Sequence, residues 1–380
     1  MQFALDEDQT MLAQTAQAFV AENSPISRMR QLRDSGDTLG YDKKMLGQMA
    51  ELGWTAIPFA EADGGLGMGL TEAILVTEAM GRSLCPEPLL TSALAACQAV
   101  ALAGSAEQRS AWLPEAAEGR KVLALAYLEP GMRFDPRAIA GAATVDGTGY
   151  CLNGRKTMVL GGVGADAYVV VARTAGSPGD AAGLSLFVVP ADAKGLRAQP
   201  MKLVDGRNAA LLQLQDVKLG AEALLGESGA GFALLDDVLD RATVALCGEM
   251  LGAMQGAFDM TLAYLKERKQ FGVLVGTFQA LQHRAARMYI ETELARSATM
   301  AAARAVDAGD EQAKLFVSNA KARCSDAFVL VANEAVQMHG GIGMTDEHDI
   351  GFYMKRARAA EMTYGDAAYH RDRFAALSGY

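Results

Sequence analysis

The spacing of apolar residues along the chain changes twice and divides the sequence into three segments. In residues 1–120, apolar side chains recur at helical intervals behind an acidic first turn, as in Leu12, Ala16, Phe19 and Val20. A glycine-rich stretch, 64–69, predicts a loop, and residues 70–80 predict a further helix. The first segment is therefore predicted to be an all-α domain.

The middle segment, residues 121–225, contains short apolar runs of the kind that form strands. These runs are bounded by Gly, Pro and Asp, and they are 122–127, 167–173, 184–190 and 209–219. Asn153-Gly154 predicts a hairpin turn after Tyr150 to Leu152, because both turn positions favour a positive φ. This segment is predicted to be a compact β domain.

In the third segment, residues 226–380, the helical spacing returns. One apolar stripe steps by three or four without a break through Val317, Ala320, Cys324, Phe328, Val331, Ala335 and Met338. His339 is followed by Gly340, a common helix stop. The segment is predicted to be a four-helix bundle, so the whole chain is expected to be α+β and mostly α.

Composition narrows the classes of function. The 380 residues carry a net charge of −10 with a pI near 5.0, which argues against a nucleic-acid binder but leaves room for a local anion site. The first ten residues lack the basic region of a secretory signal, and the apolar run 89–104 contains Thr91, Ser92 and Gln98, so no membrane span is expected. Five scattered cysteines indicate reduced thiols, and we expect a soluble, cytoplasmic protein.

Generic nucleotide and metal motifs do not occur: the sequence has no GxGxxG, no GxxxxGK[ST], no HExxH and no His/Cys cluster. Longer stretches match one family instead. In chain order they are Glu51-Leu52-Gly53-Trp54, Gly64 to Gly67, Glu129-Pro130-Gly131, Asn153-Gly154-Arg155-Lys156, Arg268 to Gly272, Phe278-Gln279 and Gln337 to Gly341. In these motifs and their spacing, along nearly its whole length, the chain resembles the acyl-CoA dehydrogenases.

The resemblance implies an FAD-dependent dehydrogenation of an acyl-CoA thioester. In the family, a carboxylate removes the α-proton while a hydride passes from the β-carbon to flavin N5, and hydrogen bonds stabilise the developing enolate charge. Each FAD lies across a subunit interface. One subunit holds the isoalloxazine ring and supplies the base, and its neighbour contacts the ADP end. The expected electron acceptor is an electron-transferring flavoprotein.

The residues that such a chain donates to its neighbour's flavin are present. They are Arg268, Gln270, Phe271, Phe278, Gln279, Gln337, Gly340 and Gly341. By the resemblance, Arg268 pairs with the diphosphate through its fork of donors. The two phenylalanines pack on the adenosine, the glutamines offer hydrogen bonds, and the glycine pair lets the diphosphate approach backbone N–H groups.

The residues that hold a chain's own flavin have changed. Leu128 stands at the Thr of the family's TEP stretch, and Met158 and Leu160 stand where the family has a Trp beside the ring and a Thr bonded to it. Tyr364 stands at the catalytic Glu, and a phenol with a pKa near ~10 is a poor base at neutral pH. Asp366 replaces a Thr that faces the diphosphate.

The catalytic base of this chain is not identified by the resemblance. Some family members carry the base on an earlier helix, where this chain has Ala242, followed by Thr243 at a family Arg. Asp240 matches a family Asp of the substrate channel, with a helix-terminal role as the alternative reading. Asp366 and Asp240 are the candidates, whereas Glu249 is expected to be a structural charge.

Three hypotheses are open. In the first, the chain is one subunit of a heteromeric dehydrogenase, its own site is degenerate, and it completes a partner's FAD site. Residues 245–256 and 365–370 are also similar to small subunits of pimeloyl-CoA-type dehydrogenases and to paired bacterial dehydrogenases of bulky or steroid-derived acyl chains. In the second, a self-sufficient homo-oligomer uses a displaced base. In the third, a non-redox acyl-CoA-binding or structural protein uses the same scaffold. A flavin-dependent oxidase on this fold is a further alternative.

Overall fold

The computed structural model describes residues 4–380, which form two compact units. The bundle unit consists of the described residues up to Ser35, together with Gly69–Cys85 and Thr243–Tyr380. The sheet unit consists of Gly36–Met68 and Pro86–Ala242. Helix α7 (Gly231–Glu267) is continuous from the sheet unit into the bundle unit.

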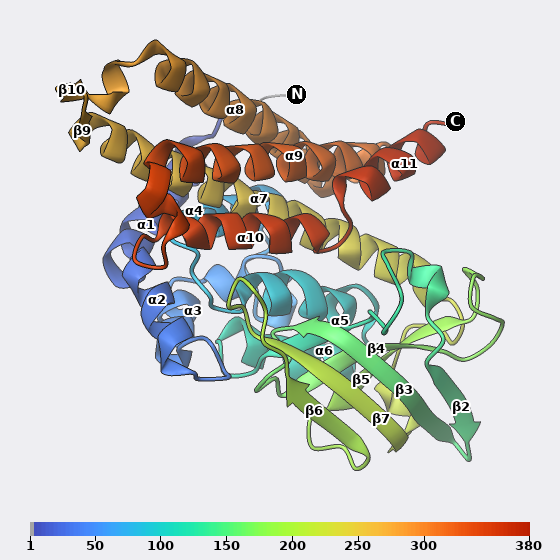
Figure 1. The fold of residues 1–380 in the computed structure, drawn as a ribbon. Coiled ribbons are helices and arrows are strands. Elements are labelled where there is room, and N and C mark those ends of the chain that lie inside the picture. The colour runs from blue at the N-terminus through green and yellow to red at the C-terminus, as the bar shows by residue number, and fades with distance from the viewer. Residues whose placement is uncertain (1–3) are drawn as a thin grey trace. The chain divides into compact units, whose positions relative to one another are not determined.

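The sheet unit is built on one eight-stranded sheet (Figure 1). Its strands follow the order β6-β7-β3-β2-β4-β5-β8, and β1 pairs with β4 in parallel. The strands are β1 (Leu123–Ala126), β2 (Ala142–Asp146), β3 (Gly149–Leu160), β4 (Ala167–Arg173), β5 (Leu184–Pro190), β6 (Leu196–Pro200), β7 (Ala209–Leu219) and β8 (Leu224–Leu225). The unit also contains α3 (Lys43–Glu51), the π-helix η3 (Leu89–Ala96), α5 (Cys97–Ala103) and α6 (Ala106–Ala117).

The apolar runs of the middle segment form the interior of this unit. All of β4 is buried, and so is β5 apart from its last residue, because both faces of these strands are covered. Tyr168, Phe187 and Leu212 belong to one buried cluster. The strands predicted near 122–127, 167–173, 184–190 and 209–219 are confirmed.

The hairpin turn predicted at Asn153-Gly154 is wrong. Both residues lie inside β3, at a bulge opposite Asp216, and the turn joining β2 to β3 lies at Asp146–Gly149. The Asn153 side chain accepts a hydrogen bond from the backbone N of Asp216 (2.9 Å) and donates one to its carboxylate (3.2 Å). Gly154 is needed because a Cβ there would lie 3.0 Å from the Cα of Gly141. An Asn-Gly pair can therefore mark a bulge inside a strand instead of a turn between strands.

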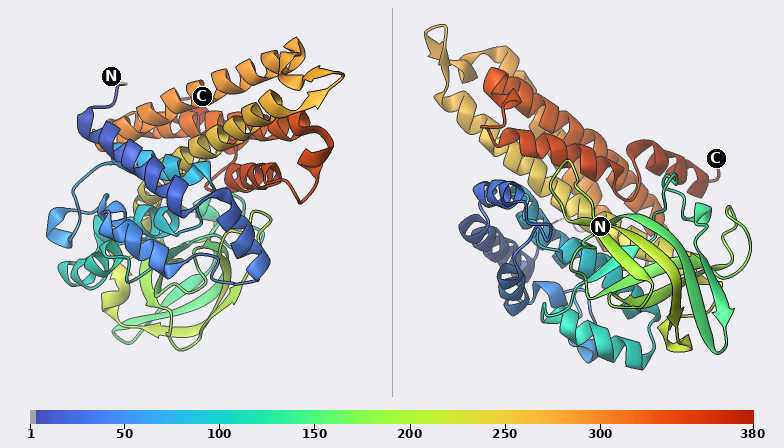
Figure 2. Two further views of the ribbon diagram at one scale, coloured as in Figure 1. Left: turned by 90° about the vertical axis from the view of Figure 1, so that its left-hand side faces the viewer. Right: turned by 60° about the horizontal axis from the view of Figure 1, so that its bottom comes forward.

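The bundle unit is helical (Figure 2). Its helices are α1 (Glu7–Asn23), α2 (Ile26–Ser35), α4 (Leu70–Arg82), the second part of α7, α8 (Gln279–Asp307), α9 (Ala313–His339), α10 (Ile350–Met362) and α11 (Ala367–Leu377). A short hairpin of β9 (Lys269–Gln270) and β10 (Val273–Leu274) joins α7 to α8. Every residue of the predicted stripe on α9 is buried, and the helix ends at His339 as predicted.

Helices α4 and α7 approach each other at a row of glycines. Gly248, Gly252 and Gly256 recur every four residues and therefore share one face of α7. A Cβ at Gly252 would overlap the carbonyl oxygen of Glu78 on α4, and one at Gly256 would overlap that of Arg82. The two backbones therefore touch without intervening side chains.

The fold class is α+β and mostly α, as predicted, with a helical N-terminal segment, a central sheet and a C-terminal bundle. The predicted domain boundaries at residues 120 and 225 stay a prediction. Within residues 4–380, no helix combines the length and the apolar character that crossing a bilayer requires.

Candidate functional site

Three chain segments meet at one end of the bundle unit. The ring of Tyr264, near the end of α7, lies 4.6 Å from that of His339, the last residue of α9. Near the start of α8, Arg284 forms an ion pair of 2.8 Å with Glu334 on α9. These contacts bring together the β9–β10 hairpin, the start of α8 and the turn that follows α9. Of the eight residues predicted to serve a neighbour's flavin, seven lie on or directly beside these segments, and Gln337 lies in the last turn of α9.

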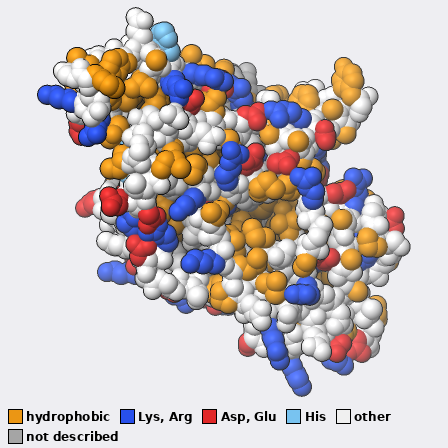
Figure 3. Space-filling model, in the orientation of Figure 1, with side chains coloured by type: hydrophobic (Ala, Val, Ile, Leu, Met, Phe, Trp, Pro, Cys, Tyr) orange, Lys and Arg blue, Asp and Glu red, His pale blue; other side chains and the backbone are white. Residues whose placement is uncertain are grey.

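The aromatic pair at this bundle end is exposed. Phe271 is 91% exposed, and it sits in the left-handed region with φ of 55° at the tip of the β9–β10 hairpin. Its ring meets that of Phe278 edge-on at 6.3 Å. Hydrophobic side chains gather over this end of the bundle in Figure 3. The hairpin tip therefore presents an aromatic surface to solvent that no other described residue covers.

The polar groups at the same end are available for binding. Within residues 4–380, no side-chain hydrogen bond or ion pair is formed by Arg268, Gln270, Gln279 or Gln337. Gly340 has a φ of 64°, and a Cβ at Gly340 or Gly341 would meet no atom within 4 Å. The turn therefore presents open backbone, the arrangement that lets an anionic group approach N–H donors.

His339, the last residue of α9, holds the start of the Gly340-Gly341 turn in place. It is buried, its Nδ1 is 2.7 Å from the carbonyl oxygen of Ala335, and its ring lies between Tyr264 and His348, 4.4 Å from the latter. Burial lowers the pKa of His339. Around neutral pH the ring is therefore an uncharged packing element.

The sheet unit carries the residues predicted to face the chain's own flavin. Leu128 and Leu160 are half-buried, and Met158 is partly exposed with φ of 51°. The backbone oxygen of Leu128 accepts a hydrogen bond from Thr157 N (2.9 Å), so the 128 and 157–160 stretches lie side by side. The two leucines offer no polar side-chain group to a flavin ring.

The motif residues Glu129 and Lys156 form a buried ion pair that the sequence did not reveal. Lys156 Nζ donates to Glu129 Oε1 (2.6 Å), and the same carboxylate accepts from the backbone N atoms of Ala140 and Gly141 (2.9 Å each). Burial lowers the pKa of Lys156, and the charge of Glu129 opposes that shift. The Glu129 carboxylate therefore joins the loop residues Ala140 and Gly141 to Lys156 of β3.

In the bundle unit, Tyr364 lies on a constrained turn between α10 and α11. It has φ of 59°, and its backbone oxygen is 3.1 Å from Nε2 of the buried His370. Lys321 Nζ donates to the carbonyl oxygens of Gly365 (2.7 Å) and Glu361 (3.0 Å) and to Ser325 Oγ (3.0 Å). Burial lowers the pKa of Lys321 to about 8. Two buried side chains thus fix the turn at the family's base position.

Asp366 is the N-cap of α11. Its carboxylate accepts a hydrogen bond from Tyr369 N at 2.8 Å, and the residue has the extended backbone of a cap. The carboxylate also carries the charge that helix N-termini favour. A structural role therefore accounts for Asp366 without catalysis.

The candidate channel residues lie on α7. Asp240 and Thr243 are both buried, one turn apart. Further along the helix, Glu249 forms an ion pair of 2.5 Å with the buried Arg356 of α10. Glu249 is thus a structural charge, as expected.

Comparison with known proteins agrees with the fold. Models of the N-terminal, middle and C-terminal domains of acyl-CoA dehydrogenases match residues 6–120, 124–217 and 229–377. The acyl-CoA dehydrogenase FadE12 of Mycobacterium tuberculosis is 31% identical over 85% of this chain and 84% of its own. A solved structure of a variant of the Tcur3481–Tcur3483 steroid ACAD superposes with a TM-score of 0.87 and 32% identity, covering 98% of each chain. The ChsE4–ChsE5 complex from Mycobacterium tuberculosis gives 0.89 and 26%, covering 100% and 99%.

Fold and sequence together define an FAD-dependent oxidoreductase that acts on acyl-CoA. The chain belongs to the acyl-CoA dehydrogenase family.

Proposed function

We propose that this chain is one subunit of a heteromeric acyl-CoA dehydrogenase, in which its own site is degenerate and it completes the FAD site of a catalytic partner. The observation that carries the proposal is a division among the motif residues. Those that act on a neighbour's flavin are kept, whereas those that act on the chain's own flavin are replaced. Independent drift of a single site would not respect that division.

The kept residues fit the ADP portion of FAD. Arg268 and the glutamines have unused donors, Phe271 and Phe278 offer exposed aromatic faces, and Gly340-Gly341 offers open backbone. A guanidinium fork, stacking surfaces and accessible N–H groups are what a diphosphate and an adenine require. Their exposure in the single chain supports use by a second chain.

The replaced residues fit the chemistry poorly. Tyr364 offers a phenol in place of the carboxylate base, and Asp366 is engaged as a helix cap. FAD, when bound, accepts the hydride from the substrate's β-carbon. In the proposed complex this chain's residues bind and orient the cofactor, and proton removal belongs to the catalytic partner.

A tagged copy of this chain tests the proposal. The chain is purified alone and with a co-purifying acyl-CoA dehydrogenase subunit, and the flavin-to-protein ratio and acyl-CoA turnover are measured for both. We expect little flavin in the chain alone, and near-full occupancy with turnover in the complex. Because one similar structure is that of a steroid ACAD, the substrates tested in the assay include steroid-derived as well as linear acyl-CoAs.

Two variants in the complex sharpen the test. Arg268→Met is expected to weaken FAD binding about tenfold, the loss of a charge-assisted contact. Tyr364→Phe removes the hydroxyl of the residue that stands at the family's base position, and it is expected to leave turnover unchanged. Loss of turnover in Tyr364→Phe would instead place catalysis in this chain.

Asp240 supports a second candidate, the self-sufficient homo-oligomer. It is a buried carboxylate on α7, one turn before Thr243. In this case the chain purified alone contains flavin, an acyl-CoA reduces that flavin, and Asp240→Asn abolishes the reduction. Asp366→Asn with full turnover would remove the other candidate base.

The same preparations test the remaining alternatives. A complex that never carries flavin favours a non-redox acyl-CoA-binding role. Rapid reoxidation by dioxygen favours an oxidase, whereas reoxidation only by an electron-transferring flavoprotein favours the dehydrogenase. The homo- or hetero-oligomeric state follows from the mass of the active complex.

A further inference from the structure

The turn Gly340-Gly341 begins a loop whose ring packing is confined to His348, which lies 4.4 Å from the ring of His339. The loop runs from Gly340 to Asp349, between α9 and α10, and Ile342 and Met344 within it are exposed. Its local bonds are short-range, such as Thr345 Oγ1 donating to the carbonyl oxygen of Ile342 (2.8 Å). Between Gly340 and Thr345 the loop therefore depends on local bonds, and segments of this kind open at lower energetic cost than helices packed in a core.

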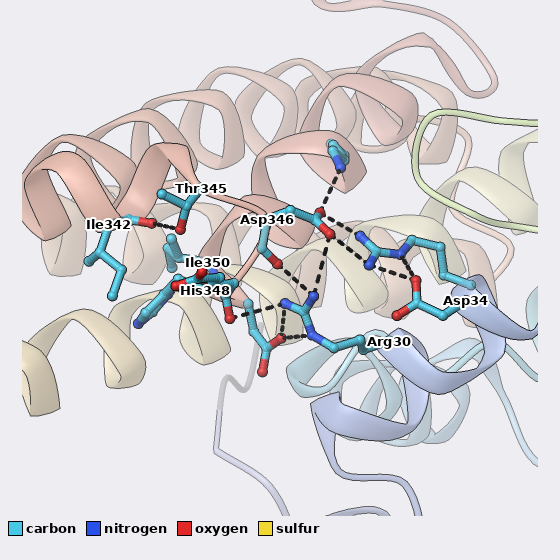
Figure 4. A network of polar contacts seen from close by, with 11 residues as sticks. Arg30, Asp34, Ile342, Thr345, Asp346, His348 and Ile350 are labelled. Atoms are coloured by element: carbon cyan, nitrogen blue, oxygen red, sulfur yellow. Dashed lines mark hydrogen bonds and ion pairs between the residues drawn. The ribbon is translucent and has the colours of Figure 1, made fainter.

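Two arginines of α2 fasten the far end of this loop (Figure 4). Arg30 Nε and Nη2 both donate to Asp349 Oδ1 (2.9 and 2.6 Å), and Nη1 donates to the carbonyl oxygen of Asp346 (2.6 Å). Arg33 makes a two-pronged contact with the Asp346 carboxylate (2.6 and 2.9 Å). We call these four residues the α2 clamp.

The clamp is held rigidly on its own side. Arg30 and Arg33 lie one helical turn apart on α2, and both guanidinium carbons lie 4.9 Å from the ring centre of the buried Phe352 on α10. Both arginine side chains are three-quarters buried. Arginine side chains that already stack on a ring lose less conformational entropy on pairing with a carboxylate than mobile surface arginines do.

The clamp also neutralises charge. Asp346 and Asp349 are carboxylates on the loop that begins with the candidate diphosphate turn, and uncompensated they would repel a diphosphate. Arg33 holds the pKa of Asp346 below its usual range, so the carboxylate stays ionised and paired.

We infer that Arg30 and Arg33 are positioning residues for FAD: by clamping Asp346 and Asp349 they pre-order the Gly340–Asp349 loop, so that its first turn meets the FAD diphosphate without further ordering. The inference rests on the proposed function. Pre-ordering raises affinity because the loop loses less entropy on binding.

The test uses the complex with its catalytic partner, stripped of flavin. FAD and ADP dissociation constants are measured by fluorescence titration, and hydrogen exchange is followed over residues 340–349. In Arg30→Met we expect both dissociation constants to rise about tenfold and exchange to accelerate, while the absorption spectrum of bound FAD stays unchanged. Arg33→Met, whose partner Asp346 is more exposed, should weaken binding about threefold.

Charge reversal separates positioning from general destabilisation. Arg30→Asp combined with Asp349→Arg restores an ion pair with reversed polarity and should recover most of the FAD affinity that Arg30→Asp alone loses. Asp349→Asn keeps an acceptor oxygen for Arg30 and removes only the negative charge, so its effect should be smaller than that of Arg30→Met. The control is Arg371→Met, which breaks the ion pair with Asp326 between α11 and α9 and should not change FAD affinity.

If the wild-type complex binds FAD and Arg30→Met binds FAD and ADP equally well, the inference is overturned and the proposed function stands. A wild-type complex that binds no FAD overturns the proposed function and the inference with it. If Arg30→Met does not fold, the Arg33→Met comparison decides in the same way.

Discussion

The ion pair of Lys156 and Glu129 leads to a prediction about the stability of the sheet unit. Lys156 is 1% exposed, so Lys156→Met strands a carboxylate that keeps two backbone donors but loses its cation. We expect a loss of about 3 kcal/mol in the free energy of unfolding, measured in urea. The double change Glu129→Gln, Lys156→Met should cost less than the two single changes together. Additive losses would mean that the two charges are not coupled.

Lys321 predicts a pH dependence. Its pKa is about 8 in the folded chain against 10.5 for an exposed lysine, so between these values the unfolded chain binds the additional proton. The free energy of unfolding contributed by Lys321 therefore rises with pH in this window. Wild-type should gain roughly 2 kcal/mol more than Lys321→Met between pH 7.5 and 9.5. Parallel pH profiles for the two proteins would rule out a depressed pKa.

At the residue scale, the sequence predicted which positions differ from the family but not what they do. That Asp366 caps α11, or that Glu129 binds Lys156, depends on partners far apart in the chain or on backbone geometry. The α2 clamp gave no signal, since Arg30 and Asp349 are separated by most of the sequence. The exposure of Phe271 followed only from the family resemblance, because an aromatic residue taken by itself favours burial.

The glycine row of α7 carries an element-scale prediction. Gly252→Ala places a methyl group on the Glu78 carbonyl and should cost about 3 kcal/mol, because neither backbone can withdraw. Gly47, in the middle of α3, has no atom within 4 Å of a Cβ. Gly47→Ala should therefore stabilise the protein by about 0.5–1 kcal/mol through helix propensity alone. Urea unfolding of both variants gives the comparison, and a neutral Gly252→Ala would contradict the close approach.

Elements were predicted well where one period continued over many residues. The α9 stripe falls in this class, whereas β4 and β5 were predicted from short apolar runs. The prediction failed at Asn153-Gly154, where a two-residue turn signal was overridden by pairing with β7 across a bulge. Local turn preference is weaker than a ladder of hydrogen bonds with buried side chains on one face.

At the scale of the whole molecule, a change at Phe271 is expected to affect FAD binding in the complex without affecting the folding of the chain. Because it is 91% exposed, Phe271→Ser should change the free energy of unfolding of the isolated chain by less than about 0.5 kcal/mol. In the proposed complex the same change should weaken FAD binding about tenfold, by removing an aromatic surface. Val145→Ser, also at an exposed apolar position, is the control and should alter neither quantity. Equal FAD binding by both variants would remove Phe271 from the site.

The contact of α4 with α7 also limits how the gene can vary. Every missense change in a glycine codon adds atoms, and at Gly248, Gly252 and Gly256 there is no room for them. Any missense change at these codons therefore pushes the two helices apart, and the cost in stability does not depend on the reaction that the enzyme performs. The three glycines are thus a requirement of helix packing in this chain, separate from any requirement of the flavin or acyl-CoA sites.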